Sequence, residues 1–277
     1  MMIDSDDSSS YGYSMHNATG THSSLEKKKS YDMNVTTRNY EITRRDIQGR
    51  TLLHYFSFRG DLENAKKLMN YSFPVDLTDN NLNSSLHVAS EFAQPYLVQF
   101  LLERGALINR QNMNGKTALH LAVEKNNKQI ADLLLAHGAN PNIVDLEGAS
   151  ALHYASAYGY QEISSALLNR GAFVNIKDYS KETPLFWAIR ESKIEMVELL
   201  IRNGANLNSS NDDGETPLDL AHEFDEDDIS LLIQKALNPS SLSSANYNFN
   251  FPLKSQPLNF VNPKSEQPIP EYRPQSL

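Results

Sequence analysis

Four histidines at intervals of 33 residues are the first candidates for chemistry: His54, His87, His120 and His153. Imidazoles bind zinc at about 2 Å and transfer protons near neutral pH. Packed helices lie roughly 8–10 Å apart, so histidines separated by one repeat cannot share a metal ion. Phe186 and Asp219 occupy the same position in the next two repeats. We therefore expect each imidazole to be structural, bonded to a nearby hydroxyl or to the backbone of the neighbouring unit.

No motif for enzymatic chemistry accompanies these histidines. The sequence contains no cysteine, which excludes disulfides and thiol catalysis. It also lacks the glycine-rich loops of nucleotide-binding proteins, the H-E-x-x-H helix of zinc proteases and the G-x-S-x-G turn of esterases. Trp187 falls in a repeat position that also contains Tyr55 and Tyr154, which favours packing between units over ligand binding. We predict a non-enzymatic protein without metal or cofactor.

Composition limits the class of protein and its partners. Hydrophobic residues make up 40% of the 277 residues, which is enough for a substantial core. The formal net charge of −9 disfavours a surface that neutralises nucleic-acid phosphates. The start of the sequence is acidic, unlike a signal peptide, and no apolar run is long enough to span a bilayer. We expect a cytoplasmic and/or nuclear protein that binds neither nucleic acid nor membrane.

The elements that position these side chains follow from the 33-residue repeat. Six units, without insertions or deletions, start at Asp46, Asp79, Asn112, Asp145, Asp178 and Asn211. One apolar position reads Leu53, Leu86, Leu119, Leu152, Leu185 and Leu218, and another reads Leu68, Leu101, Leu134, Leu167, Leu200 and Ile233. Such a period indicates supersecondary units that stack and bury their apolar faces against one another.

Each unit is predicted to contain two short helices and a turn. In the third unit Gly115 allows the positive φ of a turn, and Thr117 offers an N-cap oxygen. Gly138 is placed to end the second helix in the left-handed conformation. The residues expected to face the core are Leu119, Ala122, Val123, Ile130, Leu133 and Leu134. Helices of about ten residues are unstable alone, so stacking must stabilise them.

This pattern resembles the ankyrin repeat, whose unit carries Thr-Pro-Leu-His near the start of its first helix. Here the motif reads Thr183-Pro184-Leu185-Phe186 in the fifth unit and Thr117-Ala118-Leu119-His120 in the third. The resemblance implies an all-α solenoid of stacked helix–turn–helix units with β-hairpin-like loops, spanning residues 41–238. The flanking segments, residues 1–40 and 239–277, are rich in polar residues or proline, and we expect them to be disordered.

Several glycine positions of the repeat are occupied by other residues. These are Leu82 and Lys181 in the turn, Ser72 after the first unit's second helix, and Ala93, Asn126 and Ser192 between helices. A positive φ is unfavourable for a residue with a Cβ, so we expect local irregularity in these units. Pro95 is expected to begin a helix, because no hydrogen bond is lost at that position.

The resemblance also implies a function, since proteins of this family generally bind other proteins through the concave face, formed by loop tips and the exposed ends of the first helices. At the helix ends we predict partner contacts from Phe58, Arg59, Phe92, Glu124, Lys125, Tyr158, Arg190, Glu191, Glu223 and Phe224. At the tips we predict contacts from Met113, Leu146 and Tyr179. Exposed aromatic, Met and Arg side chains are typical interface anchors. The chain on its own is expected to be a monomer.

The sixth unit has an unusual charge. Nine acidic residues and no Lys or Arg lie between Asp212 and Asp228. Such a run keeps an end unit soluble, and it also attracts a partner with a basic surface. The sequence leaves both interpretations open.

Three narrower hypotheses remain. The chain resembles inhibitors of the NF-κB/Rel type, which join a phosphorylatable arm to such a stack with an acidic end. Ser5 and Ser9 match the spacing of that family's degradation signal, but Asp6 replaces its glycine. Alternatively, the chain is a recruiting or regulatory subunit of an enzyme, tethered by its C-terminal segment. Finally, a resemblance to hydroxylated ankyrin proteins predicts modification of Asn109, Asn142, Asn175 and Asn208, each eight residues after a helix leucine.

Overall fold

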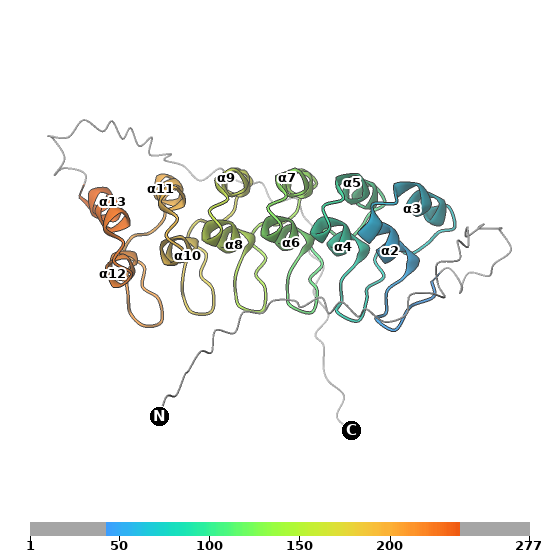
Figure 1. Ribbon diagram of the computed structural model, residues 1–277, viewed down its shortest axis with the longest axis horizontal. Coiled ribbons are helices and arrows are strands. Elements are labelled where there is room, and N and C mark those ends of the chain that lie inside the picture. Colours follow the sequence, from blue (N-terminus) through green and yellow to red (C-terminus); the bar gives the residue numbers. More distant parts are fainter. Residues whose placement is uncertain (1–42, 239–277) are drawn as a thin grey trace, which may run out of the picture.

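Residues 43–238, which the computed structural model describes, form six units stacked in one row with two layers of helices (Figure 1). The first helices form one layer: α2 (Leu52–Arg59), α4 (Ser85–Glu91), α6 (Ala118–Glu124), α8 (Ala151–Ala157), α10 (Pro184–Arg190) and α12 (Pro217–Glu223). The second helices form the other: α3 (Leu62–Met69), α5 (Pro95–Glu103), α7 (Lys128–Ala136), α9 (Gln161–Asn169), α11 (Ile194–Arg202) and α13 (Asp227–Leu237). The predicted all-α solenoid is confirmed. No helix within this range is long and apolar enough to cross a membrane.

The helix starts follow from local sequence. Every first helix is preceded by a Ser or Thr in extended conformation, as Thr117 is before α6. Proline occupies the first turn of α10, α12 and, as predicted for Pro95, of α5. A proline there loses no hydrogen bond, and its fixed φ suits the helix. The sequence therefore sets the phase of each helix within its unit.

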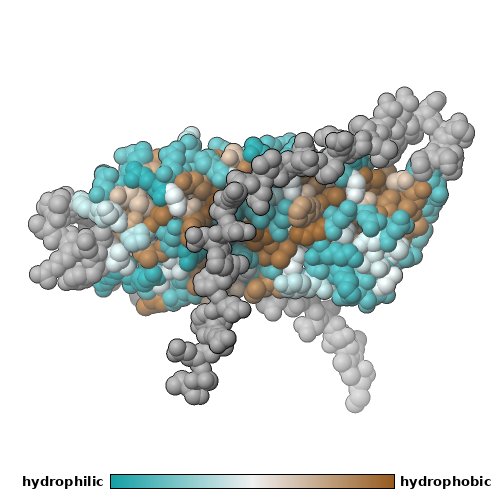
Figure 2. All heavy atoms as spheres, turned by 180° about the vertical axis from the view of Figure 1, so that it is seen from behind, coloured by the Kyte–Doolittle hydropathy of each residue, from teal (hydrophilic) through white to brown (hydrophobic). Residues whose placement is uncertain are grey.

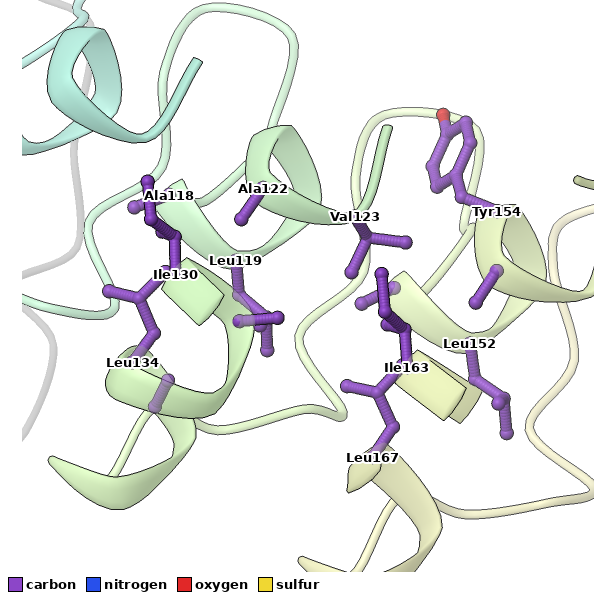
Figure 3. Close-up of a cluster of buried hydrophobic side chains, with 14 of the residues drawn as sticks. Ala118, Leu119, Ala122, Val123, Ile130, Leu134, Leu152, Tyr154, Ile163 and Leu167 are labelled. Atoms are coloured by element: carbon purple, nitrogen blue, oxygen red, sulfur yellow. The ribbon is translucent and has the colours of Figure 1, made fainter. Parts of the chain in front are cut away.

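The core runs continuously through the stack. In Figure 3, Leu119, Ile130 and Leu134 of the third unit converge, and Val123 points towards Ile163 of the fourth. These side chains are at most 1% exposed. Leu133 was predicted to face the core but is only half-buried. Its neighbours Ala131 and Leu135 lie on the inner stripe of α7 instead, because that stripe is wide enough to include positions i+1 and i+5 from Ile130.

The loops between units form projecting tips below the layer of first helices (Figure 1). Each tip is held by the Asp or Asn that starts its unit. Asp145 Oδ1, for example, accepts the N–H groups of Glu147 at 2.9 Å and Ala149 at 3.0 Å. Neighbouring tips are joined by backbone bonds, such as Leu146 N–H to the Asn114 carbonyl at 3.1 Å. The tips are therefore a connected ladder rather than independent loops, with isolated antiparallel bridges at Thr78–Ser84 and Val144–Ser150.

The substituted glycine positions keep the backbone of the regular units. Positive φ values between 52° and 59° occur at Ser72, Leu82, Ala93, Asn126, Lys181 and Ser192. The expected local irregularity is present in the first unit, where α3 ends at Met69, one residue earlier than the second helices of units two to five. At the other substituted positions the turn keeps the left-handed conformation with a residue that has a Cβ, so these positions carry backbone strain.

Candidate functional site

The four spaced histidines bridge neighbouring units. Each Nδ1 accepts the N–H of the Ser or Thr before its helix, at 3.0–3.1 Å. Each Nε2 contacts a carbonyl oxygen of the next unit, at 2.9–3.3 Å. Since Nδ1 is an acceptor, Nε2 carries the proton and donates it to the carbonyl. The structural interpretation is confirmed for His54, His87, His120 and His153.

Burial keeps these imidazoles neutral. It lowers the pKa of His87, His120 and His153 to about 4, although their carbonyl partners oppose the shift. Burial also lowers the pKa of His54. An imidazole with both nitrogens occupied has no free atom to offer a substrate or a metal ion. Within residues 43–238, no group of three His, Asp or Glu side chains is arranged to hold a metal.

Aromatic side chains near the tips support the unit-starting aspartates. The Tyr154 hydroxyl donates to Asp145 at 2.5 Å, and Trp187 Nε1 donates to Asp178 at 2.8 Å. Burial, together with the bond to Asp145, raises the pKa of Tyr154. The Trp187 ring lies 5.2 Å from His153 and 5.5 Å from Tyr154, both edge-on. Packing between units, predicted for Trp187, is confirmed.

A first exposed row lies at the ends of the first helices. We call it the helix-end row: Phe58, Arg59, Phe92, Glu124, Lys125, Tyr158, Arg190, Glu191, Glu223 and Phe224. All of these predicted residues are exposed except Glu124, which is half-buried. Phe58 and Phe92 meet edge-to-face at 4.5 Å, and the Arg190 guanidinium lies 5.8 Å from the Phe224 ring. Side chains from neighbouring units thus already touch along this row.

A second row lies along the tips. We call it the tip row: Ile47, Leu82, Met113, Leu146 and Tyr179, all of them exposed apolar or aromatic residues. Met113, Leu146 and Tyr179 were predicted, whereas Ile47 and Leu82 were missed. Ile47 could have been found, because it occupies the same repeat position as Met113. Leu82 stands at a glycine position of the repeat, for which the sequence predicts local irregularity and no partner contact.

Two ion pairs connect the tips to the helix-end row. Lys116, at the base of the third tip, lies 2.5 Å from Glu124 and 4.7 Å from the centre of the Tyr154 ring. In the fifth unit the signs are reversed, since Arg190 pairs with Glu182. Both rows therefore border one surface. Figure 2 shows, on the face seen from behind, that hydrophobic residues gather in a band along the stack between more hydrophilic margins.

The acidic residues of the sixth unit are spread over several elements. Asp212 pairs with Lys181 at 2.6 Å, and Asp219 accepts the Thr216 N–H at 2.9 Å. The Thr216 hydroxyl donates to the same carboxylate at 2.6 Å, and this bond, followed by the one from the N–H, lowers the pKa of Asp219. Asp213, Glu223, Asp225, Asp227 and Asp228 are exposed. Residues 211–238 contain nine acidic residues and, apart from His222, one basic residue, Lys235, so this end of the stack is strongly negative.

Three of the four asparagines considered for hydroxylation tie neighbouring units together. Asn142 Nδ2 donates to the Gly171 carbonyl at 2.9 Å, and its Oδ1 accepts the Phe173 N–H at 2.7 Å. Asn175 makes the equivalent bonds to the next unit. Asn109 Oδ1 accepts the Asn140 N–H at 2.9 Å. Asn208 lies at the corresponding place in the fifth unit. The phosphorylation candidates Ser5 and Ser9 lie outside the described residues, as does the C-terminal segment.

Comparison with known proteins agrees with this architecture. The model for the family "Ankyrin repeats (3 copies)" matches residues 22–112, 105–178 and 178–242. The chain is similar to ankyrin repeat domain-containing protein 53 of Macaca fascicularis and of Homo sapiens, at 37% identity over 78 residues. These matches cover 26% of this chain and only 16% and 14% of the two relatives, so the chain spans less than a fifth of their length. The family model extends over most of the chain, its residue range includes all six units, and the fold is the one it implies: the chain belongs to the ankyrin-repeat family.

Proposed function

We propose that this chain is a non-enzymatic module that binds another protein through the surface bordered by the helix-end row and the tip row. Proteins of this family generally mediate protein–protein interaction. The observation that supports the proposal here is the row of exposed apolar or aromatic side chains on five neighbouring tips, beside the exposed rings of the helix-end row. Isolated exposed apolar residues need no explanation, but contiguous ones mark interaction sites. Aromatic and Arg side chains of this kind dominate interface energies.

The test is an affinity purification with matched variants. Phe92→Ala and Tyr158→Ala each remove an exposed ring from the helix-end row. Gln129→Ala, on the exposed face of α7, serves as the control because it lies outside both rows. We expect the same specific partner to be recovered with the parental chain and with Gln129→Ala, and depleted with the two ring variants. Equal recovery with all four proteins would contradict the proposal.

The charge of the sixth unit supports a partner with a basic region. Acidic side chains there raise the association rate with a positively charged surface, and salt weakens the attraction. Replacing Asp213, Asp227 and Asp228 by asparagine should therefore slow association and flatten its dependence on ionic strength. An unchanged salt dependence would restrict the acidic unit to a role in solubility.

A second candidate is an inhibitor of the NF-κB/Rel type. The feature that favours it is the acidic unit at the C-terminal end of a stack of six. Its regulation would require phosphorylation of Ser5 and Ser9, which adds paired charges for recognition by a ubiquitin ligase. Turnover of a Ser5→Ala, Ser9→Ala variant at the parental rate would exclude this version.

A further inference from the structure

Leu82 has an unfavourable backbone conformation at the tip of the second unit. Its φ is 59°, whereas the same position is glycine in four of the six units. The left-handed region disfavours a residue with a Cβ, and leucine has no polar group to offset that penalty. The turn itself is fixed by Asp79, whose Oδ1 accepts the N–H groups of Asn81 and Asn83 at 2.9 and 2.8 Å. A glycine would satisfy this turn better.

Packing covers Leu82 only in part. Its side chain is 47% exposed. Lys181, the other non-glycine residue at this position, has a partner within its own chain, because its ammonium lies 2.6 Å from Asp212. Among residues 43–238 the turn does not require a leucine at position 82, and about half of this residue remains exposed. Unrelieved strain at an exposed position is typical of residues that serve a ligand.

Leu82 fills a gap in the tip row. The second unit has Asn80 where the first, third, fourth and fifth units have Ile47, Met113, Leu146 and Tyr179. Leu82 supplies an apolar side chain to that tip from two residues further along. The adjacent residue, Asn81, accepts the Met113 N–H at 2.8 Å, so the second and third tips are directly joined. As a result, each of the first five tips presents one exposed apolar side chain.

The backbone of the tips is not available to a partner strand. The N–H groups of Met113, Leu146 and Tyr179 donate to carbonyl oxygens of the preceding tips at 2.8–3.1 Å. An extended peptide would need such groups for its own hydrogen bonds, whereas a helix satisfies its backbone internally. Neighbouring layers lie roughly 8–10 Å apart, and seven residues of an α-helix rise about 10.5 Å. Apolar residues repeated every seven positions on a helix would therefore meet successive tips.

The charge of the tip residues determines which end of that helix would lie over the sixth unit. Beyond Tyr179 the row ends at Asp212 and Asp213, and Glu147 is exposed in the fourth tip. Lys181 is already paired with Asp212. At the position of Glu147 the first three tips carry the uncharged residues Gln48, Asn81 and Asn114, whereas the sixth carries Asp213. An occupant that extends to the sixth tip therefore meets exposed carboxylates at the fourth and sixth tips and an uncharged residue at that position in the first three.

We propose that the tip row, with Leu82 as an anchor, docks an amphipathic helix of another protein whose end over the sixth unit carries Lys or Arg. This inference rests on the proposed protein-binding function and specifies the chemistry of the partner. Contacts within the chain do not explain why an exposed, strained leucine stands at position 82. A role in recognition would explain it.

The experiment uses the full chain and a displayed library of random peptides about 30 residues long, because four steps of seven residues between five tips span about 29 positions. Selected peptides are measured against the parental chain, Leu82→Gly and Ser72→Gly. Ser72 is the matched control, because it is exposed and also left-handed, at φ 56°, but precedes the tip and lies outside the tip row. Tyr158→Ala tests the helix-end row in parallel.

We expect selected peptides to have apolar residues at helical spacing and a basic end. Both glycine variants should raise the melting temperature, while only Leu82→Gly should weaken peptide binding, by about tenfold or more, as for loss of an interface anchor. Binding to Leu82→Gly within about twofold of the parental chain overturns the inference. If Tyr158→Ala still weakens binding in that case, the proposed function stands. Failure to select any peptide overturns the inference. Self-association of the chain that Leu82→Gly abolishes also overturns it, because the occupant of the tip row would then be a second copy of this chain.

Discussion

Replacing His120 by phenylalanine should make the stack less sensitive to acid. The substitution copies the fifth unit, where Phe186 is fully buried at the same repeat position. His120 is buried, with Nδ1 accepting the Thr117 N–H and Nε2 donating to the Ala149 carbonyl. Protonation would place a second hydrogen on Nδ1, where the Thr117 N–H already points. The charged form would therefore be buried without solvation and would have to displace that N–H contact, leaving Nδ1 only the Thr117 hydroxyl oxygen, 2.9 Å away, as an acceptor.

The size of the effect follows from the pKa difference between the two states. Burial lowers the pKa of His120 from 6.5 to about 4 in the folded chain. The unfolded chain binds the extra proton more readily, so the stabilisation is fully present above pH 6.5 and is lost as the pH falls towards 4. At about pH 5 the loss is about 2 kcal/mol for one histidine. His87 and His153 have the same lowered value, so the three together would lose about 6 kcal/mol if they act independently.

The assay is urea unfolding followed by circular dichroism, near pH 7 and near pH 5, for the parental chain and for His120→Phe. We expect the pH-dependent loss of unfolding free energy to be about 2 kcal/mol smaller in the variant. Carboxylates titrate in both proteins, so the difference between the proteins isolates His120. The reasoning fails if both lose the same free energy between the two pH values, whatever the variant does to stability at neutral pH.

Three further outcomes are expected. Leu134→Ala, at a fully buried position, should cost about 2–5 kcal/mol in unfolding free energy, whereas Leu146→Ala, at an exposed tip, should cost little; a large loss at Leu146 would contradict the assignment of the tips. Ser156→Ala should raise stability by about 1 kcal/mol in the same urea assay, because the buried Ser156 hydroxyl has no hydrogen-bond partner, and destabilisation would reveal a partner. Peptide masses from a host with an asparaginyl hydroxylase should show one added oxygen at the four candidates, Asn109, Asn142, Asn175 and Asn208; unmodified peptides would remove that prediction.

The fold was predictable because the same pattern of apolar, capping and turn residues occurs in six units. A helix start such as Thr117, or a core position such as Leu134, is supported by its counterparts in other units. Leu133 was misplaced, since Leu134 and Leu135 after it are apolar too and only the packing decides which of them face inwards. The candidate surface was predictable in outline, because equivalent positions lie on one face. Leu82 was missed because the other units predict a glycine at this position, so comparison between units gives no indication of an exposed apolar side chain. Only the structure shows that the leucine keeps the turn and extends an apolar row.

The imidazole bridges also give the stack a direction. His54, His87, His120 and His153 each close a bond onto the following unit, so the first five units are linked in series. Phe186 makes no such bond to the sixth unit, and the Thr183 hydroxyl before its helix is buried without a partner. A repeat array opens where the coupling between neighbours is weakest. We expect the acidic unit to exchange its amide hydrogens first, as a separate opening segment, and a partner that covers it would suppress that exchange and stabilise the end of the array.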